Sequence, residues 1–266
     1  MGIGPGYGKG NMEHIESFDC SVIYYTSNYL EEKNPYFLGN TRRYLEKAIK
    51  DKPLIVVSHK PVQWPRVDEN IVVGDIGRSH LNIYRQILAG AKAAKTKWVA
   101  LAEDDILYSE SHFNPQFFVK KEIMEKDVFL YDMNKLSLFT WSKPPVFSFR
   151  SKRKVVNQLI ASRQYLVDAM EERFKRLEYL KDKWPEWKIL KFWGDPGRYE
   201  GNLGVTERFT YEFYSWVPSI VFSHEYAYGY EYNQGNRKKL GDIRIIEVMD
   251  WGKASEVLRL WKKEGY

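Results

Sequence analysis

Short apolar runs alternate with amphipathic stretches along the first half of the chain. Consecutive apolar residues predict buried strands at residues 21–26, 54–57, 71–73 and 98–102. Between these runs, apolar residues recur at helical spacing over residues 41–50 and 79–95, with Asn40 or Thr41 and Ser79 as candidate N-caps. This order of elements, with its short connections, predicts an α/β fold in which a mostly parallel central sheet is flanked by helices.

The second half of the chain is less regular. Apolar and aromatic runs predict strands at residues 128–131, 136–140, 146–149, 159–162 and 219–223. The strand at 159–162 is expected to return to the central sheet. Helices are expected at residues 164–181, 206–215 and from about Lys253 onward. Residues 184–204, which are rich in Trp, Gly and Pro, are expected to form an active-site loop.

Composition and targeting signals limit the class of protein. A chain of 266 residues fits one large domain or two small ones, and 44% apolar residues are enough for a substantial core. Residues 1–18 are expected to be a flexible tail, because no predicted strand precedes their glycines as in a phosphate-binding loop. No apolar run approaches the roughly 18 residues of a membrane span, and no secretory signal is evident. The single Cys20 suits a reducing compartment, so a cytoplasmic location is expected.

The net charge of +6 is unevenly distributed. Residues 1–134 carry 17 Lys and Arg against 18 Asp and Glu, whereas residues 135–266 carry 24 against 17. The second half also holds 25 of the 42 aromatic residues and two basic clusters, at residues 150–154 and 237–239. Basic and aromatic surface together can bind a nucleic acid, which makes it a plausible partner. The alternatives are a sugar-binding platform, core packing and ordinary solvated faces.

The strongest chemical signal is Glu103-Asp104-Asp105, directly after the apolar run at residues 98–102. A buried strand would deliver three carboxylates to the carboxyl edge of the sheet, which is where α/β folds bind ligands. Burying that much charge is prohibitive without compensation, so the sequence predicts a solvated rim that holds a cation and a nucleotide. The alternative is a solvated turn after the strand.

Residues 70–108 resemble the family-2-like glycosyltransferases of the GT-A fold. Those enzymes carry a loosely patterned helix, an apolar strand and a D-x-D-type acidic motif, which correspond here to Gly77–Asn82, residues 98–102 and the acidic triplet. A second resemblance lies downstream, where Glu200 is followed by Pro218, a short apolar strand and His224. The order and rough spacing of these features match over about residues 20–230. This chain departs from the family at Glu103, where Asp is usual.

The resemblance implies a GT-A-like fold in which residues 19–134 bind a nucleotide-diphosphate sugar and residues 135–266 bind the acceptor. It implies a divalent cation, Mn²⁺ or Mg²⁺, held by Asp105 and His224, with Glu103 and Asp104 contacting the donor or orienting the ligands. An imidazole ligand favours Mn²⁺. An inverting enzyme also needs a general base. By its spacing to His224, Glu200 is the first candidate for this base.

Other site residues follow from their positions along the chain. Glu207, at a loop-to-helix boundary, is the second candidate base. Donor contacts are expected from the end of the first strand and from two positions between residues 75 and 78. These donor-contact candidates are Thr26, Ser27, Asn28, Asp75 and Arg78. Arg78 precedes a predicted helix N-terminus, where a diphosphate would fit, although an ordinary solvent-facing arginine is the alternative.

The function expected from these features is metal-dependent transfer of a sugar from a nucleotide-diphosphate donor to an acceptor hydroxyl. A viral-type DNA glycosyltransferase acting on a hydroxymethylated pyrimidine would suit the basic second half, with the base stacked on Trp184, Trp187 or Trp193. Saccharide, lipid-linked and protein acceptors are alternatives. Two other classes stay open, a nucleotidyltransferase and a non-catalytic nucleic-acid-binding domain. The first would want a glycine-rich loop after the first strand, which residues 25–30 lack.

Overall fold

The computed structural model describes residues 18–149, 153–227 and 243–262. The predicted tail, apart from Phe18, lies outside these ranges. The same is true of the basic cluster at residues 237–239 and of most of the cluster at 150–154.

The centre of the molecule is a seven-stranded sheet with the order β10-β6-β9-β4-β1-β2-β3. Its strands are β1 (Cys20–Thr26), β2 (Leu54–Ser58), β3 (Glu69–Val72), β4 (Trp98–Ala102), β6 (Phe129–Asp132), β9 (Leu159–Ser162) and β10 (Thr210–Phe213). β9 runs antiparallel to β4 and β6, whereas every other pairing in this sheet is parallel. The predicted fold class, a mostly parallel central sheet flanked by helices, is confirmed.

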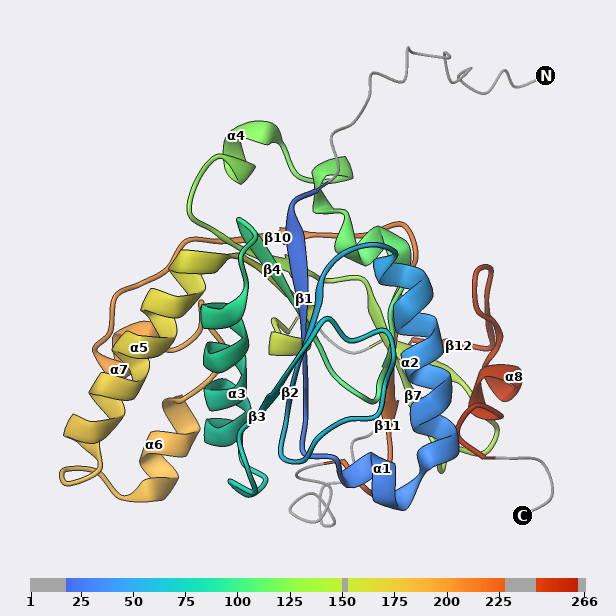
Figure 1. Cartoon of the computed structure of the whole chain (residues 1–266). Coiled ribbons are helices and arrows are strands. Elements are labelled where there is room, and N and C mark those ends of the chain that lie inside the picture. Colours follow the sequence, from blue (N-terminus) through green and yellow to red (C-terminus); the bar gives the residue numbers. More distant parts are fainter. Residues whose placement is uncertain (1–17, 150–152, 228–242, 263–266) are drawn as a thin grey trace.

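Helices cover both faces of this sheet (Figure 1). Side chains of β1 alternate in direction, so Ile23 and Tyr25 face α3 (His80–Ala93) and α5 (Arg163–Leu180). Val22 and Tyr24 face the opposite side, which α2 (Pro35–Ile49) covers. Each face therefore has its own apolar core, and β1 and β4 are buried along their whole length.

A five-stranded second sheet packs beside the central one, in the order β12-β8-β7-β11-β5. Its strands are β5 (Ile106–Leu107), β7 (Lys135–Phe139), β8 (Phe147–Phe149), β11 (Ser219–Ser223) and β12 (Arg244–Ile245). A third apolar cluster joins this sheet to α1 (Tyr29–Lys33), α2 and α8 (Ala254–Leu258), with Phe37, Phe222 and Trp261 at its centre.

Short elements complete the described chain. The helical turns are η1 (Glu110–Phe113), η2 (Pro115–Phe117), η3 (Val156–Gln158), α4 (Lys121–Met124), α6 (Glu186–Phe192) and α7 (Glu200–Leu203). Two small strands, β13 (Glu247–Val248) and β14 (Gly252–Lys253), pair with each other. No helix in the described ranges is long and apolar enough to cross a membrane.

Three expectations about elements need correction. The helix predicted at residues 206–215 is wrong, because β10 occupies this stretch and pairs with β6. Aromatic and β-branched residues dominate β10, and its pairing partner decides the outcome. Residues 184–204 are not simply a loop, since they contain α6 and α7. The helix expected from residue 41 begins at Pro35, capped by the Asn34 side chain, which accepts the Phe37 N–H at 3.1 Å.

Helix α3 lies so close to the sheet that only glycine fits at one position. A Cβ on Gly90 would lie 2.5 Å from Ile23 Cγ2 and 3.1 Å from Val57 Cγ2, whereas a Cβ on Gly39 in α2 meets nothing within 4 Å. We expect Gly90→Ala to lower the free energy of unfolding by about 1–3 kcal/mol through overpacking. Gly39→Ala should raise it by up to about 1 kcal/mol through helix propensity. Urea unfolding of the two variants provides the test, and equal stabilisation by both would contradict the close packing of α3.

Candidate active site

A cavity of about 660 Å³ opens at the carboxyl ends of β1 and β4. Side chains from both sheets and from α3 line it. The predicted site residues that line the cavity are Thr26, Ser27, Arg78, Glu103, Asp104, Asp105 and His224. The predicted site residues that lie outside its lining are Asn28, Asp75, Glu200 and Glu207.

Asn28 and Asp75 have structural contacts beside the cavity. Asn28 is buried in a left-handed backbone conformation, and its side chain accepts the Lys60 N–H at 2.9 Å and donates to Glu31 at 2.5 Å. Asp75 is exposed, and its Oδ1 lies 3.5 Å from Nδ1 of His59, which does line the cavity. Neither side chain is part of the cavity lining.

The first two carboxylates of the triplet are held by hydrogen bonds. Both oxygens of Glu103 accept a bond of 2.6 Å, one from the Tyr25 hydroxyl and one from the Asn157 amide. Asp104 Oδ2 accepts the Thr26 hydroxyl at 2.8 Å. Because β1 and β4 are parallel neighbours, the residues after Ala102 lie beside the end of β1. With both oxygens taken, Glu103 is better placed to shape the cavity than to bind a metal directly.

Burial and electrostatic repulsion raise the pKa values of these two acids. Burial raises the pKa of Glu103 to about 8 and that of Asp104 to about 6, and in both cases the charge of Asp105 adds to the effect. The hydrogen bonds from Asn157, Tyr25 and Thr26 act in the opposite direction but do not cancel the burial. The positive charges near Asp104, those of His224 and Arg42, lower its pKa but do not offset its burial and the repulsion from Asp105.

Asp105 and His224 lie next to each other at the cavity wall. His224 Nε2 lies 3.4 Å from Asp105 Oδ2. The second sheet brings them together, since β11 ends just before His224 and the Phe222 N–H donates to the Asp105 carbonyl at 3.0 Å. Asp105 Oδ1 and His224 Nε2 are both buried without a hydrogen-bond partner. Both are atoms that can bind a metal, and their lack of a hydrogen-bond partner is a feature that a bound cation would explain.

Arg78 closes one side of the cavity. Its guanidinium donates to the Tyr226 carbonyl at 2.6 Å and lies 4.1 Å from the centre of the Tyr29 ring. Ser79 caps α3 as predicted, accepting the Asn82 N–H at 3.1 Å. A cation beside a helix N-terminus favours negatively charged ligands.

Sequence reasoning missed a carboxylate on the opposite wall. Asp195 lines the cavity and accepts the Tyr84 hydroxyl at 2.8 Å, while Arg198 lies 3.2 Å from its other oxygen. Its position between Gly194 and Pro196, inside the predicted active-site loop, was the available signal. Nothing in the sequence separates it from the other acids of that loop.

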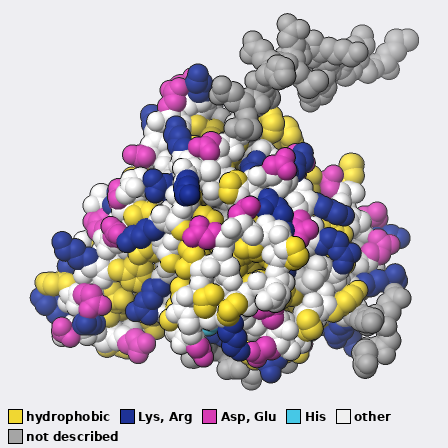
Figure 2. Space-filling model, in the orientation of Figure 1, with side chains coloured by type: hydrophobic (Ala, Val, Ile, Leu, Met, Phe, Trp, Pro, Cys, Tyr) yellow, Lys and Arg dark blue, Asp and Glu magenta, His cyan; other side chains and the backbone are white. Residues whose placement is uncertain are grey.

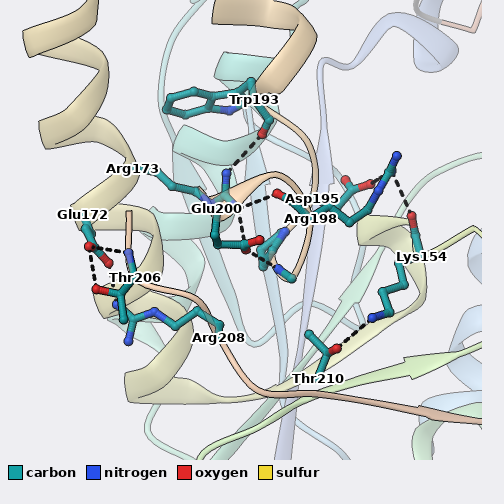
Figure 3. A network of polar contacts seen from close by, with 12 residues as sticks. Lys154, Glu172, Arg173, Trp193, Asp195, Arg198, Glu200, Thr206, Arg208 and Thr210 are labelled. Atoms are coloured by element: carbon teal, nitrogen blue, oxygen red, sulfur yellow. Dashed lines mark hydrogen bonds and ion pairs between the residues drawn. The ribbon is translucent and has the colours of Figure 1, made fainter. Parts of the chain in front are cut away.

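Glu200 is not part of the cavity lining and forms a buried ion pair with Arg173 (Figure 3). Its Oε1 lies 2.7 Å from Nη2 of Arg173, whose side chain is 1% exposed, and it also accepts the Gly197 N–H. Arg173 additionally donates to the carbonyls of Trp193 and Arg198. This network holds the loop that carries Asp195. Glu207 lines a separate, open depression beside α7 together with Glu200 and Arg208.

The tryptophans predicted to stack a base differ in exposure. Trp193 is almost fully buried and packs on Tyr84 and Phe174. Trp184 is half-buried against Phe192. Only Trp187 of the three is exposed.

The sequence matches no protein-family model and no curated protein. Similar solved structures include a nucleotidyl transferase from Methanothermobacter thermautotroptrophicus, 14% identical with a TM-score of 0.33, covering 58% of this chain and 76% of that chain. The galactosyltransferase LgtC, in complex with donor and acceptor sugar analogs, is 10% identical with a TM-score of 0.37 and coverages of 62% and 66%. The glycosyltransferase GlyE from Streptococcus pneumoniae is 8% identical with a TM-score of 0.38 and coverages of 73% and 45%. These scores are too low to assign a family or an activity.

The raised pKa values predict a pH-dependent stability. In the folded protein Glu103 and Asp104 hold protons up to about pH 8 and 6, but the unfolded chain releases them near 4.5 and 3.8. The two side chains therefore contribute fully to stability below the pKa values that they have in the unfolded chain. This contribution is lost as pH rises toward 8. Thermal melting in chelator should show a falling midpoint between pH 5 and 8. Glu103→Gln should flatten this profile, and an unchanged slope in the variant would contradict the assignment.

The buried ion pair predicts a structural effect at Glu200. Glu200→Gln leaves the Arg173 charge buried without a counter-charge, so the free energy of unfolding should fall by about 3–5 kcal/mol. Glu207→Gln, on the open surface beside it, should change stability by less than about 0.5 kcal/mol. Denaturant unfolding separates the two. A Glu200→Gln variant that keeps full stability would favour the catalytic role expected from sequence.

Proposed function

We propose that this chain is a divalent-cation-dependent glycosyltransferase that takes its sugar from a nucleotide-diphosphate donor. The main support is that Asp105 Oδ1 and His224 Nε2, two buried atoms of neighbouring side chains, lack a hydrogen-bond partner at the wall of a cavity of about 660 Å³, a size in the usual range for small-molecule sites. Its position at the carboxyl ends of parallel strands agrees with ligand binding in other α/β folds.

The residues present fit a cation with few protein ligands. The described residues contain no group of three His, Cys, Asp or Glu side chains around one point, so Asp105 and His224 would be the protein's share. Mg²⁺ and Mn²⁺ take their other ligands from phosphate and water. When bound, such a cation would act as a Lewis acid that neutralises charge on the leaving diphosphate.

Asp105 is the firmer of the two ligands. His224 Nδ1 accepts the Tyr226 N–H at 3.1 Å, which in a neutral imidazole puts the proton on Nε2. A metal at Nε2 needs the opposite tautomer, so this contact would have to break. We propose Mn²⁺ ahead of Mg²⁺ because one ligand is an imidazole.

The opposite wall supplies the second chemical group. We propose Asp195, rather than Glu200 or Glu207, as the general base that takes a proton from the acceptor hydroxyl in an inverting reaction. Asp195 lines the cavity, and the Tyr84 hydroxyl fixes its orientation. Glu103 and Asp104, tied to β1 by Tyr25 and Thr26, keep the rim rigid.

The two alternative functions have less support. A nucleotidyltransferase would want a glycine-rich basic loop after the first strand, but β1 is followed by Ser27, Asn28 and α1. A non-catalytic nucleic-acid-binding domain would not need three carboxylates at its cavity, where they repel phosphate.

The acceptor is a finer part of the proposal. Hydroxymethylated DNA remains a candidate, with Trp187 as the exposed ring for stacking, beside saccharide, lipid-linked and protein acceptors. A gain in mass of a hydroxymethylated oligonucleotide would test the DNA acceptor. A cytoplasmic location stays a prediction from the single Cys20.

Melting with a panel of UDP-, GDP-, ADP- and CMP-sugars tests the proposal, with and without Mn²⁺. We expect one donor to raise the midpoint only when Mn²⁺ is present. Asp105→Asn should abolish this response and lower donor turnover at least 100-fold, whereas Asp195→Asn should keep the response and lose turnover by a similar factor.

The matched control is Asp75→Asn, which changes an exposed acid outside the cavity lining. Its melting response and turnover should equal those of the unmodified chain. The proposal is wrong if no donor shifts the midpoint, or if the Asp105→Asn variant responds as strongly as the unmodified chain.

A further inference from the structure

Helix α6 and the end of α5 form an exposed surface of basic and apolar side chains, called here the α6 surface. Its members are Arg176, Tyr179, Lys183, Trp184, Trp187, Lys188, Leu190 and Lys191. Residues 175–191 carry six Lys and Arg against three Asp and Glu. In Figure 2, hydrophobic and basic side chains lie next to one another at the lower left, with some acidic side chains among them, where Figure 1 places these two helices.

Helix α6 is apolar on two faces but has protein on only one. Ile189, Phe192 and the following Trp193 pack against the core around α3 and α5. On the outer face, Trp187 is 66% exposed and Leu190, one turn later, is 41% exposed. Large apolar side chains exposed next to each other often mark an interaction site, and in the described structure nothing covers this outer face of α6.

The cations of this surface are free to meet a negative partner. Within the described ranges, none of Lys183, Lys188 and Lys191 forms an ion pair with a carboxylate. Lys183 Nζ lies instead 3.7 Å from the Tyr179 ring centre, and Lys188 Nζ lies 4.0 Å from that of Trp184. Lysines with apolar stems beside exposed Trp and Leu form the pattern of helices that lie in a membrane interface.

We propose that the α6 surface docks the protein on an anionic lipid bilayer, with Trp187 and Leu190 entering the interface and the lysines meeting lipid headgroups. A nucleic acid fits less well. Leu190 has no group for base stacking or base-edge hydrogen bonds, and the Tyr179 and Trp184 rings already have cations over them. An anionic bilayer can interact with both the aliphatic and the basic side chains of this surface.

The α6 surface is directly connected to the cavity. Trp193, immediately after α6, packs on Tyr84, and Asp195 two residues later lines the cavity. Docking through α6 would therefore bring a bilayer close to the wall where we place the general base. This arrangement favours a lipid-linked acceptor among the alternatives, a consequence that rests on the proposed function, whereas the docking itself does not.

Sedimentation with vesicles tests the docking, using phosphatidylcholine alone and phosphatidylcholine mixed with phosphatidylglycerol. The chain should bind the mixed vesicles and lose binding as salt rises. Replacing both lysines (Lys188→Gln with Lys191→Gln) should weaken partitioning by about 30-fold. Replacing both apolar residues (Trp187→Ala with Leu190→Ala) should weaken it by about 10-fold or more.

Matched controls come from surfaces elsewhere on the molecule. The first control is Trp216→Ala, because Trp216 is 69% exposed and lies beside Phe117. The second is Lys120→Gln with Lys121→Gln, which changes two exposed lysines at the start of α4. These two control variants should bind vesicles like the unmodified chain. Both controls and both α6 variants should keep the donor-dependent melting response. That response separates failure of the docking from failure of the proposed function.

Three results would overturn the docking proposal. The first is no binding to the mixed vesicles, and the second is equal loss in the control and α6 variants. The third is binding of an oligonucleotide, or self-association of the chain, that the α6 variants lose while vesicle binding is unchanged.

Discussion

Three carboxylates that follow one buried strand repel one another, and the elements around them are arranged to limit the cost of this repulsion. Glu103, Asp104 and Asp105 leave β4 at a place where burial disfavours charge, and the described chain sets no lysine or arginine ion pair against any of them. Hydrogen bonds from neighbouring elements moderate this cost without removing it. A bound cation would lower this cost, and the proposed function rests on that possibility.

The neighbouring elements can be understood from this constraint. β1 supplies the Tyr25 and Thr26 hydroxyls, and the segment of η3 supplies the Asn157 amide. The second sheet supplies His224 through the antiparallel pairing of β11 with β5. Each donor comes from a strand end or a turn fixed by extensive packing, so the carboxylates are held in one arrangement. The Arg173–Glu200 pair fixes the opposite wall in a comparable way.

Much of the fold could be predicted from local patterns. Alternating strands and helices indicated the parallel sheet, and Ser79 indicated the start of α3. The β10 stretch was misassigned because its strand conformation depends on pairing with β6, which no local pattern reports. The acidic triplet could be found because a strand and its carboxyl end are adjacent in sequence.

The rest of the site depends on tertiary contacts. Glu200 has the expected spacing to His224, but spacing along the chain does not determine which way a side chain points, and Arg173 turns it inward. Asp195 lies in the loop that this same pair holds, and contacts with Tyr84 and Arg198 fix its side chain. The exposed outer face of α6 could not be predicted, because the sequence does not distinguish the buried Trp193 from the exposed Trp187.

Proton release on cation binding tests the central claim most directly. Mn²⁺ together with a nucleotide diphosphate is titrated into the protein in a calorimeter at pH 7. Repeating the titration in buffers of different ionisation enthalpy gives the number of protons that leave the protein. The pKa values of about 8 for Glu103 and about 6 for Asp104 predict release of about one proton per cation. Binding with no proton release from the protein, after correction for the nucleotide alone, would contradict the account.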